Sequence, residues 1–205
     1  MLRRFLALLS LAFLLAPFSA RAQVVSLYLQ STNVHLSNVQ TGVIYPAGST
    51  SYVNQFTSNF TSGVGGGLTL NVIPVGPVRF GFDLRGSTNR GTPGVDTGMF
   101  GVRVAFKPPL VPIKPYLQAS GGYMQSRTTN VSTSVSGVAS ASSTFTNRYA
   151  TYEFFGGVDI SILPLLDLRL EAGGGQGINV TDIGNVNVSN NVTLFSVNPG
   201  LVLRF

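Results

Sequence analysis

Apolar residues alternate with polar or small ones along eight stretches of this chain. In the clearest stretch, Phe80, Phe82 and Leu84 are separated by Gly81 and Asp83. A period of two is the period of a β-strand whose two faces meet different surroundings. The repetition predicts an all-β protein in which each strand has one apolar and one polar face. The eight stretches are residues 23–30, 63–72, 78–85, 99–106, 116–123, 151–162, 167–173 and 192–205.

The connections between these stretches differ in length and composition. Long polar segments, rich in Ser, Thr, Asn and Gly, occupy residues 31–61, 86–97, 126–147 and 176–191. Short segments that contain proline occupy residues 73–77, 107–114 and 163–166. Long and short connections therefore alternate, as in outer-membrane barrels, which have short turns in the periplasm and longer loops outside. Pro199 cannot donate a ladder hydrogen bond, so we expect a bulge or kink there.

The N-terminus has the organisation of a secretory signal peptide. A pair of arginines precedes an apolar run, 5–18, and small residues on both sides of Arg21 supply a cleavage site. We expect cleavage after Ala22, which divides the chain into a signal peptide, 1–22, and one domain, 23–205. The alternative is an uncleaved anchor helix, but the apolar run is shorter than the roughly 18 to 20 residues that span a bilayer.

Little net charge remains once the expected signal peptide is set aside. The chain has 13 basic and 7 acidic residues, and three of its arginines lie before residue 23, which leaves ten basic residues and a net charge of +3. These ten form no cluster, so we do not expect nucleic acid as a partner. The chain has no cysteine, which excludes a small secreted domain held together by disulfides.

The charges within the strands lie on the face opposite the large apolar residues. In a soluble sandwich or a lipocalin-like barrel this charged face meets water. In a membrane barrel it fills the lumen, and the apolar face meets lipid. The strands carry five arginines and five acids, and this balance favours the membrane barrel, because charges in a confined lumen must neutralise one another. The predicted lumen charge network is Arg79, Asp83, Arg85, Arg103, Glu153, Asp159, Asp167, Arg169, Glu171 and Arg204.

Aromatic residues on the apolar face gather near the ends of the strands. Membrane barrels carry girdles of aromatic residues at both interfaces of the bilayer. The pattern therefore favours a membrane barrel over a soluble secreted barrel that binds an apolar ligand. The two predicted girdles are Phe80, Phe106 and Phe205 beside the short turns, and Phe100, Tyr123, Tyr152 and Phe154 beside the long connections.

The end of the chain resembles the assembly signal of bacterial outer-membrane proteins. The residues that carry this resemblance share one face of the last stretch and are Val197, Leu201, Leu203 and Phe205. Residues 113–117 (IKPYL) and 121–123 (GGY) are similar to strand openings in small OmpA/OmpX-type barrels. The resemblance implies a protein of the outer membrane of a Gram-negative bacterium. It also implies contact with outer-membrane lipid and lipopolysaccharide, and recognition by the outer-membrane assembly machinery.

One short segment carries a possible catalytic motif. His35 is the only histidine, and Ser37 and Asn38 follow it in the order H-L-S-N. This order resembles the active-site segment of outer-membrane lipid A deacylases, in which a histidine activates a serine. Such a histidine needs a carboxylate to orient it, yet no Asp or Glu occurs between residues 23 and 79. We therefore expect a solvated loop histidine, no catalytic residue, and no metal or cofactor site.

These observations predict an all-β, eight-stranded antiparallel transmembrane up-and-down β-barrel with a polar lumen, long extracellular loops and short periplasmic turns. Side chains fill a barrel of eight strands, so we do not expect a general diffusion porin. The predicted role is structural or one of surface interaction for a monomer, through loops 31–61 and 126–147. The alternatives are a small pore, a lipid A-modifying enzyme that uses His35 and Ser37, and a soluble ligand-binding barrel.

Overall fold

The computed structural model of the chain is a closed antiparallel barrel of eight strands in up-and-down order. It describes residues 25–44, 53–109, 111–132, 141–179 and 191–205, so the expected signal peptide lies outside the described residues. In the described segments no helix has the length and hydropathy needed to cross a membrane. The strands are β1 (Val25–Ile44), β2 (Val53–Val75), β3 (Val78–Arg90), β4 (Gly94–Phe106), β5 (Ile113–Ser132), β6 (Ala141–Leu163), β7 (Leu166–Asn179) and β8 (Asn191–Arg204).

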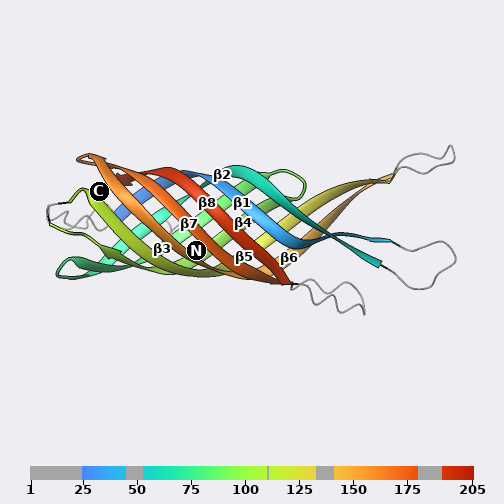
Figure 1. Cartoon of the computed structure of the whole chain (residues 1–205), viewed down its shortest axis with the longest axis horizontal. Coiled ribbons are helices and arrows are strands. Elements are labelled where there is room, and N and C mark those ends of the chain that lie inside the picture. The colour runs from blue at the N-terminus through green and yellow to red at the C-terminus, as the bar shows by residue number, and fades with distance from the viewer. Residues whose placement is uncertain (1–24, 45–52, 110, 133–140, 180–190) are drawn as a thin grey trace, which may run out of the picture.

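The two ends of the barrel differ (Figure 1). At the end where the C-terminus lies, short turns join neighbouring strands, such as residues 76–77 between β2 and β3. At the other end, the β1–β2 and β5–β6 hairpins project beyond the remaining strands. Membrane barrels have short turns in the periplasm and longer connections outside. We therefore name these the periplasmic end and the extracellular end.

The last strand closes the barrel against the first. Leu27 of β1 pairs with Leu203 of β8, so the apolar stripe of β8 has no open edge that would invite aggregation. Of the bulge or kink expected at Pro199, the bulge is wrong, because the register of β8 shifts against neither β7 nor β1 there, although pairing with β1 is interrupted between Gln30↔Gly200 and Asn33↔Val197. Proline withholds one ladder donor, and the pairing on both sides of it is enough to keep the strand in register.

Strand pairing takes up most of the connections predicted as long loops, 31–61, 86–97, 126–147 and 176–191. β1 continues to Ile44 and β2 begins at Val53, while β5 reaches Ser132 and β6 begins at Ala141. The error arose because Ser, Thr and Asn replace the apolar residues there, although ladder hydrogen bonds join backbone groups whatever the side chain. At about 3.3 Å per residue and a tilt of about 40°, a strand of 20 residues rises about 50 Å, whereas the hydrocarbon core is about 30 Å thick.

The outer surface of the barrel changes from apolar to polar toward the extracellular end. In the middle of the barrel, outward side chains are large and apolar, and Leu117 and Phe154 are 71% and 63% exposed. Further along the same two strands, the outward positions carry Gln125, Arg127 and Arg148. Apolar side chains exposed over the middle of a closed barrel are the surface that lipid covers, and the polar positions beyond them suit water.

The interior changes in the opposite sense. Inward side chains are polar or charged in the middle of the barrel, whereas a cluster of apolar side chains is buried at the extracellular end, next to polar ones such as Ser126 and Asn147. A barrel in water needs an apolar interior, whereas a barrel in lipid can place polar groups inside. The two inversions occur along the same strands, as expected where a barrel leaves the bilayer. The buried residues at the extracellular end, here named the apolar plug, are Val34, Leu36, Val39, Val95, Met124, Tyr149, Val192 and Leu194.

Candidate functional site

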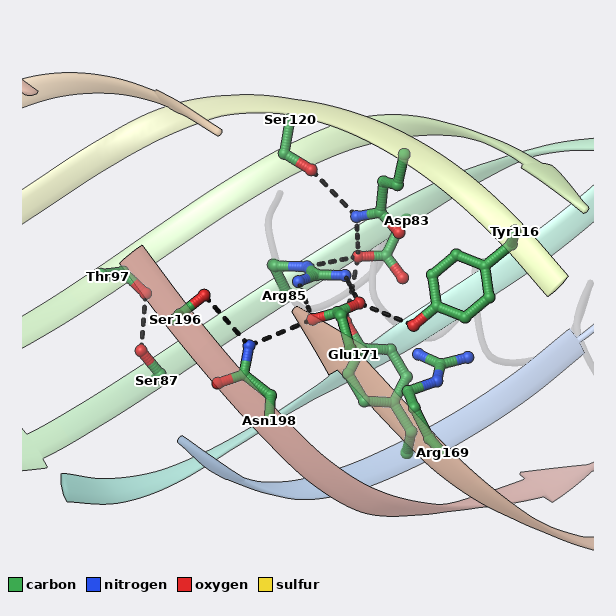
Figure 2. A network of polar contacts seen from close by, with 12 residues as sticks. Asp83, Arg85, Ser87, Thr97, Tyr116, Ser120, Arg169, Glu171, Ser196 and Asn198 are labelled. Atoms are coloured by element: carbon green, nitrogen blue, oxygen red, sulfur yellow. Dashed lines mark hydrogen bonds and ion pairs between the residues drawn. The ribbon is translucent and has the colours of Figure 1, made fainter. Parts of the chain in front are cut away.

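A network of charged side chains crosses the middle of the lumen (Figure 2). Arg85 of β3 donates to both carboxylate oxygens of Glu171 on β7, at 2.8 and 3.0 Å, and its Nε donates to Asp83 at 2.8 Å. Tyr116 Oη donates to Glu171 at 2.8 Å, and Asn198 Nδ2 donates to it at 3.2 Å. Glu171 therefore receives hydrogen bonds from three other strands, and the bidentate pair with Arg85 fixes its orientation.

Asp83 is the second centre of this network and is fully buried. Tyr28 Oη donates to it at 3.0 Å, Thr69 Oγ1 at 2.9 Å and Gln118 Nε2 at 2.9 Å. These donors come from β1, β2 and β5. A buried carboxylate is costly unless charge and hydrogen bonds compensate it, and Asp83 has both. The bonds around Asp83 and Glu171 together join opposite walls of the barrel.

A second set of ion pairs lies beside the first. Asp159 accepts from Arg103 Nη2 at 2.5 Å, and from Arg169 Nε and Nη2 at 2.8 and 3.1 Å. The guanidinium carbon of Arg103 lies 3.5 Å from the centre of the Tyr116 ring, and that of Arg169 lies 4.3 Å from the Tyr28 ring. Aromatic faces attract cations more strongly away from water. The same two tyrosines therefore hydrogen-bond the carboxylates and stack on the arginines.

The periplasmic end of the lumen is more basic. Asp167 accepts from Lys114 Nζ at 2.8 Å and pairs with Arg204 Nη2 at 2.9 Å. Lys107 follows the last residue of β4 and lies in a turn outside the membrane-spanning segments. Burial lowers the pKa of Lys107, and the positive charges of nearby basic side chains, Arg79 first among them, lower it further. After burial, the largest contributions to this lowered pKa come from positive charges at this end.

Inward aromatic rings lie against glycines of the neighbouring strand. Tyr116 pairs with Gly157, and a Cβ at Gly157 would lie 2.6 Å from the Tyr116 ring and 2.8 Å from the carbonyl oxygen of Leu170. Phe155 and Gly173 form a second pair of this kind. A glycine in a strand leaves the space that a close ring needs. Gly157 thereby allows Tyr116 to reach both Glu171 and the arginine beside it.

Replacement of Gly157 by valine should displace this ring. We expect Gly157→Val to lower the free energy of unfolding by about 1 to 3 kcal/mol, the usual cost of overpacking. Gly156→Val is the matched control, because a Cβ there meets only Leu117 Cδ2, at an ordinary 3.6 Å. Urea unfolding of both variants in lipid vesicles measures the difference. Equal losses for the two variants would contradict the role given to Gly157.

The lumen is filled rather than open. A cavity of about 30 Å³ lies between the network and the apolar plug, and another of about 50 Å³ lies on the periplasmic side. The hydrogen bonds and ion pairs around Asp83 and Glu171 separate these two cavities. Each cavity has room for only a few waters. In the part of the barrel that the structure describes, side chains therefore interrupt the path along the axis.

The ten strand charges named from the sequence all face the lumen. Nine are buried, and Arg79 lines the periplasmic cavity with partial exposure. Eight of the ten take part in ion pairs. Glu153 and Arg79 do not pair with another described residue. Glu153 instead lines the smaller cavity beside Phe155, which differs from the expectation that it would pair with an arginine.

The uncharged members of the network escaped the sequence analysis. They are Tyr28, Thr69, Tyr116, Gln118 and Asn198, and Lys114 was assigned to a turn although it binds Asp167. All lie on the inward face of their strands, so their position in the alternation was the available signal. Attention to charge alone left out the tyrosines that connect the charges.

The aromatic residues assigned to girdles lie on the outer surface. All seven are between 42% and 63% exposed, as are the four residues assigned to the assembly signal, at 47% to 52%. Phe80, Phe106 and Phe205 are at the periplasmic ends of their strands. The sequence analysis omitted Phe56, Phe60 and Phe195, which are equally exposed. The role of these rings as interfacial girdles follows the general pattern of membrane barrels and stays a proposal.

His35 lies in β1, so the expected loop histidine is wrong in its place. The His35 Nε2 atom is 3.3 Å from Ser58 Oγ, which is 3.3 Å from Ser37 Oγ. The centre of the His35 ring is 4.6 Å from that of Phe60. Among the described residues no carboxylate forms an ion pair with His35, and no three acidic or histidine side chains gather as metal ligands. Within the described part of the chain, the serine and histidine therefore have no orienting acid of the kind that nucleophilic catalysis requires.

The chain is similar to several solved structures. Neisserial surface protein A is 17% identical over 87% of this chain and 97% of its own, with a TM-score of 0.46. The N-terminal β-barrel domain of Pseudomonas aeruginosa OprF is 11% identical over 86% and 97%, with a TM-score of 0.43. Ail, the attachment invasion locus protein of Yersinia pestis, is 8% identical over 87% and 98%, with a TM-score of 0.40. No protein-family model and no curated protein matches the chain.

The distribution of residues decides what kind of barrel this is. The ring of eight strands is closed, large apolar side chains cover its outside, and paired charges fill its inside. Burial of charges in the core of a small protein beneath an exposed apolar surface is unfavourable in water and favourable in lipid. The protein is a small integral β-barrel of the bacterial outer-membrane type.

Proposed function

We propose that the protein is a non-conducting, non-enzymatic barrel that presents a rigid surface outside the cell. The observation that carries this proposal is the double closure of the lumen, by the network around Glu171 and by the apolar plug above it. A transport protein needs a continuous polar path, and an enzyme needs a reactive group in reach of substrate. The described residues supply neither, whereas they build a stiff, elongated barrel.

The extracellular end supplies the surface for contact. The β1–β2 and β5–β6 hairpins project there (Figure 1) and replace the loops 31–61 and 126–147 as the proposed contact surface. Described outward side chains at this end include Arg90, Arg127 and Arg148, and an outward acid, Asp96, pairs with Arg127. A surplus of arginine at the outer leaflet suits the phosphates of lipopolysaccharide. We propose lipopolysaccharide and outer-membrane lipid as partners of a monomer that the assembly machinery recognises through β8.

Conductance measurements separate this proposal from a small pore. We expect the purified protein to produce no current steps in planar lipid bilayers, because two layers of packed side chains close the lumen. Weakening one of the two layers should not open the lumen, so Leu36→Ala, in the apolar plug, should also produce no current steps. Regular single-channel steps from the wild-type protein would contradict the proposal and favour the pore.

The chain contains no cysteine, so single cysteines can report which end faces outward. Thr92 lies between β3 and β4 at the extracellular end, and Pro109 lies between β4 and β5 at the periplasmic end; both are exposed. A membrane-impermeant maleimide should label Thr92→Cys in intact cells, and should label Pro109→Cys only after the outer membrane is permeabilised. The reverse pattern would place the projecting hairpins in the periplasm, where they cannot serve a surface role.

A further inference from the structure

The periplasmic mouth of the lumen holds more positive charge than its acids can neutralise. The cavity of about 50 Å³ is lined by five basic side chains and two acids. Asp159 is bound by Arg103 and Arg169, and Asp167 is bound by two further basic residues. Both acids are therefore already engaged. Among the described residues, the side chains of Arg79 and Lys107 form no ion pair or hydrogen bond.

The strand register gathers three of these cations around one small side chain. Arg79 of β3 pairs with Ala105 of β4, and Arg103 and Lys107 stand two positions before and after Ala105 on the same side of the chain. Diagonal neighbours of this kind lie within reach of long side chains. The Ala105 methyl group lines the cavity and occupies little of it. A space enclosed by three cations is thus left over the pair of Arg79 and Ala105.

Arg103 supplies donors that the protein does not use. The side chain is only 4% exposed and lines the cavity, and its Nε and Nη1 have no hydrogen-bond partner among the described groups. Unsatisfied buried donors are costly, and like charges that face one another are repulsive. The lowered pKa of Lys107 has the same origin in burial and in neighbouring positive charge. Both costs are removed if an anion lies among these groups.

We propose that the periplasmic mouth is a binding site for a phosphate-type oxyanion, held by Arg79, Arg103 and Lys107 over Ala105. Arginine and lysine are the side chains that bind phosphate oxygens, arginine through its fork and lysine as a point charge. A cavity of about 50 Å³ holds about three or four water-sized groups, which suits a small tetrahedral oxyanion. The same chemistry is available from free phosphate and from the headgroup of a phospholipid in the periplasmic leaflet.

Equilibrium dialysis with labelled inorganic phosphate tests the site. The protein, folded in an uncharged detergent at constant ionic strength, should bind about one phosphate per chain in excess chloride. Arg79→Gln should weaken the binding about tenfold or more, the equivalent of one charged hydrogen bond. Ala105→Leu, which fills the cavity and leaves every charge in place, should weaken it as much. Arg90→Gln, at the extracellular end, removes the same charge and should change nothing.

The heat-dependent gel mobility of each variant checks that it has folded. Wild-type binding no stronger than that of Arg79→Gln, or an undiminished Ala105→Leu, would overturn the proposal. Vesicles then separate the two sources of the oxyanion. Phosphate binding that is equally strong in phosphatidylcholine and in phosphatidylglycerol vesicles indicates free phosphate as the ligand. Phosphate binding that is weaker in phosphatidylglycerol vesicles indicates that a lipid headgroup occupies the same site. Either result supports the proposed site.

Discussion

Phe82→Arg should lower the free energy of unfolding by roughly 2 to 4 kcal/mol, the measured range for an arginine at the midplane on the lipid face of a barrel. Phe82 points outward from the middle of the apolar part of β3, is 42% exposed, and stacks on Phe100 with ring centres 5.7 Å apart. A guanidinium at this depth must leave water, and the outward acid that the structure describes, Asp96, lies at the extracellular end and already pairs with Arg127. Urea unfolding of the protein in lipid vesicles, followed by gel mobility, measures the loss.

The matched control places the same charge higher on the same outer surface. Thr193 points outward from β8 near its extracellular start, beyond the apolar surface. Thr193→Arg should change stability by no more than about 0.5 kcal/mol, as surface substitutions usually do. Phe82→Leu, which keeps an apolar side chain, should cost less than about 1.5 kcal/mol. If the two arginine variants are equally stable, the face of β3 that carries Phe82 is not in lipid.

Removal of Glu171 should be as damaging from the inside. Glu171→Leu leaves the buried Arg85 without its bidentate partner and Tyr116 without an acceptor, and it removes one of the two acceptors of Asn198, which keeps Ser196 Oγ. Loss of one member of a buried ion pair costs about 3 to 5 kcal/mol, because the other charge stays buried and uncompensated. Asp83 still binds Arg85 at 2.8 Å, so we expect the lower part of that range in the same urea assay.

The double variant shows whether the charge is the cause. Arg85→Met combined with Glu171→Leu removes both members of the pair, and replacement of a buried pair by apolar residues is often neutral or better. We therefore expect the double variant to be more stable than Glu171→Leu alone, with a coupling of about 1 kcal/mol or more between the two sites. Strictly additive losses would indicate that the two side chains act independently and that the network is not a unit.

The middle of each strand was predictable from the sequence, and the extracellular extensions were not. Between Phe80 and Leu84 apolar and polar residues alternate without interruption, so both the strand and its outward face follow from the period. From Asn33 to Ser37 the polar residues lie outward and the apolar Val34 and Leu36 lie inward. This reversal looks like a loss of pattern when one apolar face is assumed throughout. It is the point at which the solvent around the barrel changes.

The site was predictable in its composition and less so in its connections. Charged residues opposite an apolar outer face must point into the lumen, so the alternation determines on which face of the barrel they lie. Their partners depend on the stagger between strands that are distant in the chain, and period-two alternation carries no information on that stagger. Arg85 meets Glu171 from 86 residues away, while Glu153 meets a cavity instead of an arginine. Gly157 makes room for Tyr116 only because the register places the two opposite each other.

Spin-label accessibility along β5 tests the membrane assignment most directly. Labels at the outward positions Leu117, Ala119, Gly121 and Tyr123, and at Gln125 and Arg127 beyond them, should be compared in vesicles for collisions with oxygen and with a water-soluble nickel complex. We expect oxygen to dominate up to Tyr123, because lipid covers those positions, and the nickel complex to dominate from Gln125, where the outer surface turns polar. Nickel accessibility at Leu117 and Ala119 equal to that at Arg127 would contradict a barrel embedded in lipid through this face.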